Sequence, residues 1–284
     1  MLHAIEYLGE VGVGVTSPQF FRACNGNTYV VKFQNNQLRS KVLVSELLAA
    51  KLGTILSLCF PPSDIIVISE EIVNKNPILV DLGLVPGRYF ASLYLSNAEY
   101  VGKGRLSKAI NVSEMAGVVL FDHIFHNADR AKNQRNLLLR LEDDDYIVYA
   151  IDNSHLFRSS RWNIDSLEKL GTKIKIYYYQ HYRNLLKDVL SAQDFIPYIE
   201  KINKLTNDGI DDIVQQIPKE WLPDESESKA LADYIKLRRD MTDEIWEKLS
   251  RFIPRTRGGK RWLFSSFAPP ENDINNYHKQ SNKN

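Results

Sequence analysis

A polar stretch between two apolar segments carries the residues best suited to chemistry. The sequence HNADRAKNQRNLLL, residues 126–139, contains one carboxylate, Asp129, which is followed by the amides of Asn133 and Asn136. A carboxylate in such a loop can orient an attacking hydroxyl or accept its proton. The alternative is a solvated connection in which the asparagines cap turns. Spacing alone leaves both interpretations open.

Two apolar runs, 137–141 and 146–151, follow this stretch and are typical of strands joined by a turn in EDDD. Pairing outward from this turn in an antiparallel hairpin brings Asn136 and Asp152 together at its open end. An amide oxygen and a carboxylate oxygen suit Mg²⁺, which completes its shell with phosphate and water. With Asp129 nearby, this is the layout that phosphoryl transfer requires. Alternatively, Asp152 caps a turn.

The N-terminal third offers a possible phosphate-binding cation. Lys32 lies in the strand-like run TYVVKF, and Glu46 lies in a helical pattern over 40–52. Glu46 has apolar neighbours three and four residues away, so its carboxylate needs a cationic partner, and Lys32 is the nearest candidate. Kinases use a strand lysine held by a helix glutamate to present an ammonium to phosphates. The alternatives are a snorkelling edge lysine and an exposed helix-edge glutamate.

A glycine-spaced turn, GEVGVGVTS at 9–17, precedes this strand. Gly9, Gly12 and Gly14 would let backbone N–H groups approach a phosphate closely. The turn lacks the GxxxxGK[ST] pattern, and no helix follows it, which disfavours a P-loop NTPase or a dinucleotide-binding fold. An ordinary hairpin turn is the alternative.

The elements that position these residues divide the chain into a β-rich first third and a mainly helical remainder. Strand patterns cover 3–7, two runs flanking the Asn25-Gly26 turn, 65–71 and about 78–82. The helix over 40–52 is expected to stop at Gly53. Further helical patterns cover 112–126, 164–191, 193–206, 209–216 and 227–252.

Bulk composition excludes several classes of protein. The formal net charge of the 284-residue chain is +1, which disfavours nucleic acid and anionic membranes as partners. No window reaches the length of apolar sequence that a membrane span needs. Cys24 and Cys59 form no CxxC or zinc-ligand pattern, which suits a reducing compartment. We expect a cytoplasmic protein without a membrane segment.

Five elements in order give the chain a family resemblance. The glycine-rich turn with VVKF, then SELLAAKLG, PGRYFAS, NADRAKNQRNLLL and YAIDNSHLF resemble the HipA-like kinases, an atypical branch of the protein-kinase-like fold that also resembles phosphoinositide kinases. The resemblance implies a two-lobed α+β fold. The β-rich N-lobe would span 1–95, the helical C-lobe with a small metal-binding hairpin 96–253, and a partly disordered tail 254–284.

The resemblance also implies an ATP- and Mg²⁺-dependent kinase that transfers the γ-phosphate to a hydroxyl, most plainly a serine or threonine of a protein substrate. By position, Lys32 matches the phosphate-binding lysine, Glu46 its helix partner and Asp129 the catalytic aspartate. Asp152 matches the metal-binding aspartate, and Arg130 is expected to position the loop beside Asp129. The glycine-rich turn would contact nucleotide through Gly12, Gly14, Val15 and Thr16.

Two departures from the family pattern concern the metal site. The metal-binding asparagine usually lies about five residues beyond the catalytic aspartate, whereas Asn133 lies four and Asn136 seven residues beyond Asp129. The hairpin pairing favours Asn136, with Asn133 as second choice. Asp152 is followed by Asn153 and Ser154 rather than Phe-Gly. A nucleotide-binding pseudokinase or partner-binding module is therefore the second hypothesis, and a lipid or small-molecule kinase is the third.

Overall fold

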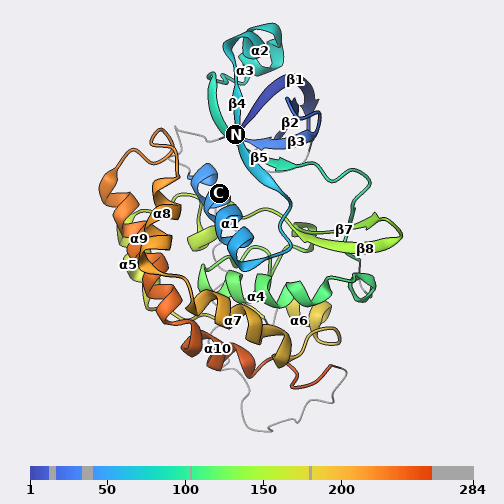
Figure 1. Ribbon diagram of the computed structural model, residues 1–284, viewed down its shortest axis with the longest axis vertical. Coiled ribbons are helices and arrows are strands. Elements are labelled where there is room, and N and C mark those ends of the chain that lie inside the picture. The colour runs from blue at the N-terminus through green and yellow to red at the C-terminus, as the bar shows by residue number, and fades with distance from the viewer. Residues whose placement is uncertain (13–16, 34–40, 103, 179–180, 258–284) are drawn as a thin grey trace, which may run out of the picture.

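The first third of the chain forms a small β-barrel at one end of the molecule (Figure 1). The computed structural model describes residues 1–12, 17–33, 41–102, 104–178 and 181–257. The barrel strands, in the closed order β1-β2-β3-β5-β4, are β1 (Leu2–Glu10), β2 (Gln19–Ala23), β3 (Thr28–Lys32), β5 (Gly87–Leu93) and β4 (Ser63–Ile68). Only the β1–β4 pair is parallel.

Alternation along β3 decides which side chains fill the barrel. Tyr29 and Val31 are buried in a core shared with Phe21 of β2, so the next residues of the same strand face the other way. Lys32 therefore lies on the face opposite the barrel core. The predicted hairpin between β2 and β3 is confirmed, and Gly26 has the positive φ of 82° that its tight turn needs.

Helix α1 (Val42–Leu56) covers the outer face that presents Lys32, but its own core is shared with the helical part of the chain. The helix was predicted to stop at Gly53, which is wrong: it continues to Leu56 and is capped by Ser57, whose φ is 55°. Gly53 instead provides space, because a Cβ there would lie 2.5 Å from Cδ2 of Phe60.

The connection between β4 and β5 also differs from expectation. The predicted strand at 65–71 ends at Ile68, and Ser69 caps the helix α2 (Glu70–Lys75) by accepting from the Ile72 N–H at 3.4 Å. The predicted strand near 78–82 is wrong, because that segment forms α3 (Pro77–Asp81). Proline at the first helical position favours this start, and only Leu79 of the helix is buried.

The remainder of the described chain is mainly helical. Helix α4 (Met115–Ile124) lies at its centre, and all its residues are buried, including the polar Asp122 and His123. The predicted helix over 164–191 is interrupted after Gly171, and the one over 227–252 is two helices separated by Met241. The helices are α4 (Met115–Ile124), α5 (Ile164–Gly171), α6 (His181–Leu186), α7 (Ile196–Asn203), α8 (Asn207–Gln215), α9 (Glu225–Asp240) and α10 (Thr242–Ser250).

The predicted hairpin is present between the barrel and these helices. Strands β7 (Leu137–Glu142) and β8 (Asp145–Ala150) pair in antiparallel register, with β6 (Glu99–Tyr100) beside β7. The two residues of its turn, Asp143 and Asp144, both have positive φ. Pairing extends past the strands, since the Ile151 N–H donates to the Asn136 carbonyl at 2.9 Å.

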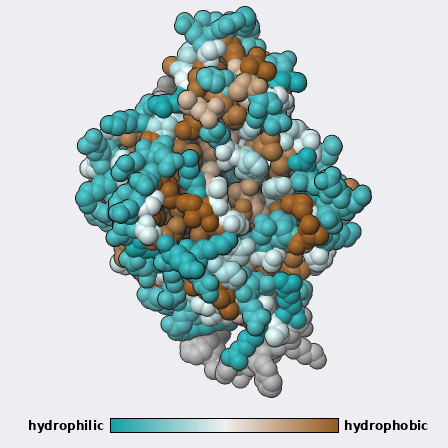
Figure 2. All heavy atoms as spheres, viewed as in Figure 1, coloured by the Kyte–Doolittle hydropathy of each residue, from teal (hydrophilic) through white to brown (hydrophobic). Residues whose placement is uncertain are grey.

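Polar and charged side chains cover most of the face shown in Figure 2, with apolar side chains at the barrel end and across the middle. Within the described ranges, no helix has both the length and the apolar character needed to cross a membrane.

Candidate functional site

Three residues from a strand, a helix and the end of the hairpin meet beside the barrel: Lys32, Glu46 and Asp152, here named the open cluster. Lys32 Nζ donates to Glu46 Oε1 at 2.5 Å and to Asp152 Oδ1 at 2.9 Å. The Lys32–Glu46 contact that the sequence predicts is present. The side chain of Asp152 is 35% exposed, whereas that of Glu46 is only 4% exposed. The cluster therefore has a buried side and a side that solvent reaches.

Mutual attraction sets the charges in the open cluster. Burial alone disfavours the ammonium of Lys32, but Asp152 and Glu46 outweigh it and raise the pKa of Lys32. Burial likewise opposes the charge of Asp152, yet Lys32 and the donors of Ser154 lower the pKa of this carboxyl. Burial raises the pKa of Glu46, which the attraction of Lys32 offsets only in part. Around neutral pH, Lys32 is cationic and Asp152 is anionic.

Asp152 uses one of its two carboxylate oxygens for all its described side-chain contacts. Oδ1 accepts from Lys32 Nζ, from Ser154 Oγ at 2.6 Å and from the Ser154 N–H at 3.2 Å. No hydrogen bond or ion pair of Oδ2 occurs within the described part of the chain. The residue has a φ of 62°, a left-handed conformation that aspartate tolerates better than most residues. The Asn153 N–H donates to Glu46 Oε1 at 3.0 Å, which ties this turn to α1.

The polar stretch 126–139 folds around Asp129. Asp129 Oδ2 accepts from Asn136 Nδ2 at 2.7 Å, and Asn133 Nδ2 donates to Asn136 Oδ1 at 3.2 Å. The backbone carbonyl of Asp129 accepts from the N–H groups of Lys132 and Asn133, which closes the turn. Both candidate asparagines thus lie in one hydrogen-bonded chain with Asp129, and Asn136 is the buried one.

The two predicted metal ligands, Asn136 and Asp152, lie near each other in the chain fold, but their side chains contact different residues. Asn136 lies opposite Ile151, next to Asp152, but its side chain contacts Asp129 while Asp152 contacts Lys32. Among the described residues, no group of three or more His, Cys, Asp or Glu could hold a metal. A metal-binding hairpin is therefore not demonstrated. The available Oδ2 of Asp152 and an amide oxygen still suit Mg²⁺, which takes few protein ligands when it also binds substrate phosphates.

Arg130 belongs to a second group of charges, here named the closed cluster: Asp122, Arg130 and Tyr182. Arg130 Nη1 donates to Asp122 Oδ1, and the Tyr182 hydroxyl donates to Asp122 Oδ2. The side chains of Arg130 and Asp122 are both 0% exposed. Burial raises the pKa of Asp122, and the guanidinium of Arg130 offsets this only in part.

The second terminal nitrogen of the Arg130 guanidinium, Nη2, binds residues 151–153 at the end of the hairpin. Its Nη2 donates to Asn153 Oδ1 at 2.6 Å and to the carbonyls of Ile151 and Asp152 at 3.2 and 3.3 Å. Arg130 thus contacts the backbone beneath the open cluster, not the carboxylate of Asp129. The sequence reasoning missed Asp122 and Tyr182. A carboxylate within the apolar run VVLFDHIF was the available signal, because it requires a buried cationic partner.

The glycine-rich turn can be described only at its start. Gly12 has a φ of 76° and open space where a Cβ would lie, which leaves its backbone approachable. The Val11 N–H donates to the Pro18 carbonyl at 3.0 Å across the base of the turn. The predicted nucleotide-contacting residues Gly14, Val15 and Thr16 lie outside the described residues.

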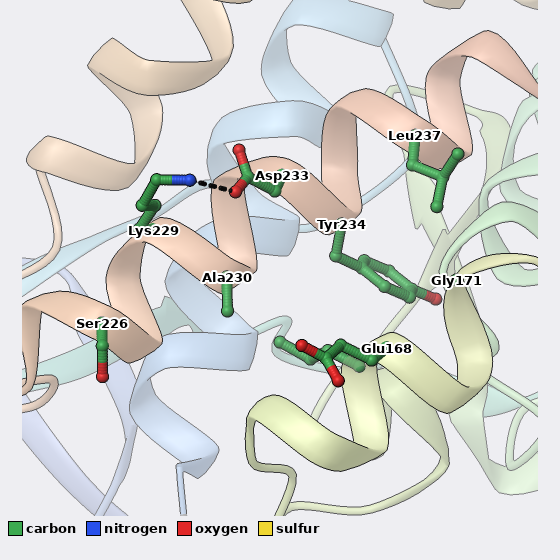
Figure 3. A pocket seen from close by; sticks show the side chains of 9 residues that line it. Glu168, Gly171, Ser226, Lys229, Ala230, Asp233, Tyr234 and Leu237 are labelled. Atoms are coloured by element: carbon green, nitrogen blue, oxygen red, sulfur yellow. Dashed lines mark hydrogen bonds and ion pairs between the residues drawn. The ribbon is translucent and has the colours of Figure 1, made fainter.

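A groove elsewhere on the helical part does not include the predicted site. It lies between α5 and α9, has a volume of about 330 Å³ and is lined by residues such as Glu168, Tyr234 and Leu237 (Figure 3). Lys229 and Asp233 form an ion pair of 2.6 Å at its edge. None of the residues predicted from the sequence lines this groove.

Comparisons with known proteins bear on this geometry. A family model described as HipA-like kinase matches residues 4–249. The search of curated proteins found no match. Among solved structures, the chain is similar to the proinflammatory kinase CtkA of Helicobacter pylori, with 14% identity, a TM-score of 0.54, and coverage of 86% of this chain and 97% of that one. It also matches HipA of Shewanella oneidensis MR-1, solved with HipB and operator DNA, with 14% identity, a TM-score of 0.44, and coverage of 84% and 67%.

Proposed function

We propose, from the premise that this chain belongs to the HipA-like kinase family, that it transfers the γ-phosphate of ATP to a hydroxyl in a Mg²⁺-dependent reaction, with serine or threonine of a protein as the acceptor. Family membership supports kinase activity, and the similarity to CtkA supports the mixed α+β fold of such an enzyme. The choice of nucleotide, metal and acceptor belongs to the proposal.

In this proposal, some residues bind the nucleotide and its metal, and others orient the acceptor hydroxyl or the hairpin end. Lys32, held by Glu46, would place its ammonium against the phosphates of ATP. Asp129, held by Asn136, would orient the acceptor hydroxyl and take its proton. Mg²⁺ bound by Asn136 and Asp152 would neutralise negative charge on the phosphates. Arg130 would act as a positioning residue, since it contacts the backbone of the hairpin end.

The convergence of Lys32, Glu46 and Asp152 carries the proposal. These residues are far apart in the sequence, and their predicted roles all require a place beside the phosphates. Their contacts of 2.5 and 2.9 Å bring a cation and a carboxylate to one partly exposed point. An ordinary surface ion pair would not need a glutamate that is almost wholly buried.

Substitution of Asp152 tests the proposal directly. Asp152→Asn and Asp129→Asn should each lower phosphate transfer from radiolabelled ATP by roughly 10³-fold or more, because each removes a charge needed in the transition state. Circular dichroism should show an intact fold, and the exposed Asp188→Asn variant serves as control. Undiminished transfer in Asp152→Asn would contradict the assignment.

A pseudokinase is the second candidate, favoured by Ser154 at the usual glycine position and by the unusual asparagine spacing. Thermal-shift and radiolabel assays with Mg-ATP distinguish it. Nucleotide binding without autophosphorylation or labelling of any acceptor would favour the pseudokinase. Labelling of lipids or small molecules alone would favour a kinase of that class.

A further inference from the structure

Ser154 occupies the position at which the kinase element normally has glycine, and its side chain has a definite partner. Its hydroxyl donates to Asp152 Oδ1 at 2.6 Å and lies 3.1 Å from His155 Nδ1. The residue is 3% exposed. Since the hydroxyl has one proton and gives it to Asp152, Oγ can accept from the Nδ1–H of His155. The serine is therefore fixed from both sides.

The hydrogen bonds of Ser154 determine which carboxylate oxygen of Asp152 contacts the rest of the protein. A carboxylate held by one flexible lysine can rotate about its side-chain torsions. Here the hydroxyl and the N–H of Ser154 join Lys32 Nζ on the same oxygen, Oδ1. Oδ2 makes no hydrogen bond or ion pair in the part of the chain that the structure describes. A glycine at this position could supply only the N–H.

We infer that Ser154 is a positioning residue that holds Asp152 Oδ1 against the protein and so reserves Oδ2 for the metal of the bound nucleotide, an inference that rests on the proposed function. A ligand oriented in advance binds a cation more tightly than one that must first be ordered. Ser154 would act on metal-dependent binding rather than on nucleotide binding in general.

The chain contains a matched control for this contact. At the start of α9, Ser226 donates to Asp224 Oδ1 through its hydroxyl at 2.5 Å and through its N–H at 2.8 Å. The spacing and the donor atoms are those of Asp152 and Ser154. This second turn caps a helix and contains none of the candidate site residues. Ser226→Ala therefore removes the same kind of hydrogen bond without touching the open cluster.

The experiment measures ADP affinity by calorimetry at several Mg²⁺ concentrations, and the Mg²⁺ dependence of phosphate transfer. Ser154→Ala should raise the Mg²⁺ concentration for half-saturation by about 10- to 100-fold, as loss of a residue that orients a metal ligand typically does. ADP affinity without Mg²⁺ should not change. Saturating Mg²⁺ should restore kcat, Ser154→Thr should restore most of the Mg²⁺ affinity, and Ser226→Ala should match the wild type.

Several results would overturn the inference. These are a Ser154→Ala variant that matches the wild type, an equal loss of ADP affinity with and without Mg²⁺, or no recovery in Ser154→Thr. Ser154→Gly provides a second variant if Ser154→Ala does not fold, because it keeps the N–H donor and lacks the hydroxyl. Failure of the wild type itself to bind ADP in a Mg²⁺-dependent way would instead contradict the proposed function.

Discussion

The open and closed clusters both contact the same short segment, residues 151–153, yet they expose their charges very differently. In the closed cluster, Arg130 and Asp122 are both 0% exposed, and Arg130 holds backbone carbonyls. In the open cluster, Lys32 contacts the side chain of Asp152, which is 35% exposed. One cluster fixes the backbone, and the other leaves a carboxylate that a ligand can reach.

This difference in exposure indicates that the two sets of ion pairs have different roles. A buried pair contributes little net stability, because desolvation offsets attraction, but removal of one partner leaves an uncompensated charge. Because an unpaired buried charge costs so much stability, the residues of the closed cluster are expected to keep their contacts with one another. A partly exposed carboxylate can exchange its contacts for those of a ligand. We therefore expect substitutions in the closed cluster to affect folding first, and substitutions in the open cluster to affect chemistry first.

Among the substitutions that distinguish the two clusters, Lys32→Met should have the largest effect on phosphate transfer. Loss of the ammonium should lower the rate of phosphate transfer by roughly 10³-fold, because a preorganised cation is removed from the phosphates. Initial rates with radiolabelled ATP measure this effect. The control is Lys75→Met, since Lys75 is 70% exposed and, among the described residues, forms its ion pair with the exposed Glu71. Transfer at the wild-type rate in Lys32→Met would remove the distinction between the two clusters.

Asp122→Asn should act in the opposite way. It leaves the buried guanidinium of Arg130 without a negative partner, so the free energy of unfolding should fall by about 3–5 kcal/mol. Urea denaturation measures the loss, and Asp188→Asn, an exposed substitution, should stay within about 0.5 kcal/mol of the wild type. An equally stable Asp122→Asn protein that transfers no phosphate would show that the closed cluster serves chemistry.

The sequence predicted elements whose signals are local. The register of the β7–β8 hairpin follows from two apolar runs and a turn between them, and Lys32 and Glu46 were paired because a carboxylate among apolar residues needs a cation. The apolar residues at 78–82 are typical of a strand, but Pro77 before them favours the start of the helix α3. Gly53 matches the local signal of a helix stop, and nothing in the neighbouring sequence indicates that it leaves space for the ring of Phe60.

The closed cluster could not be derived in the same way. Asp122 was part of an apolar helical run, and Tyr182 belongs to a segment 60 residues away. Their side chains meet only in the folded chain, where the Tyr182 hydroxyl of α6 donates to Asp122 of α4. The contact of Lys32 with Asp152 spans 120 residues and depends on how the barrel lies against the hairpin. Sequence reasoning can name such residues from their chemistry, but the fold decides which of them meet.

The smallest expected effect is a pH dependence of stability that arises from His126, the first residue of the polar stretch 126–139. His126 is buried, with Nδ1 at 3.1 Å from the Tyr177 hydroxyl and Nε2 at 3.3 Å from the Leu170 carbonyl. Burial and the positive charge of Arg238 lower the pKa of His126 to about 3. Unlike Asp122, this side chain has no opposite charge among its described contacts, so the interior favours its neutral form.

The depressed pKa fixes the sign of a pH dependence. The unfolded chain binds a proton at His126 below about pH 6.5, whereas the folded protein resists it down to about pH 3. The stability that His126 contributes is therefore present above pH 6.5 and is lost as the pH falls toward 3. The difference in unfolding free energy between wild type and His126→Gln should shrink by about 1.4 kcal/mol per pH unit between pH 6 and pH 4. Urea denaturation across this pH range measures the difference in unfolding free energy. A constant difference would mean that the protein interior accepts a charged His126 without a partner of opposite charge. That result would contradict the view that buried charges, such as those of the closed cluster, need such a partner.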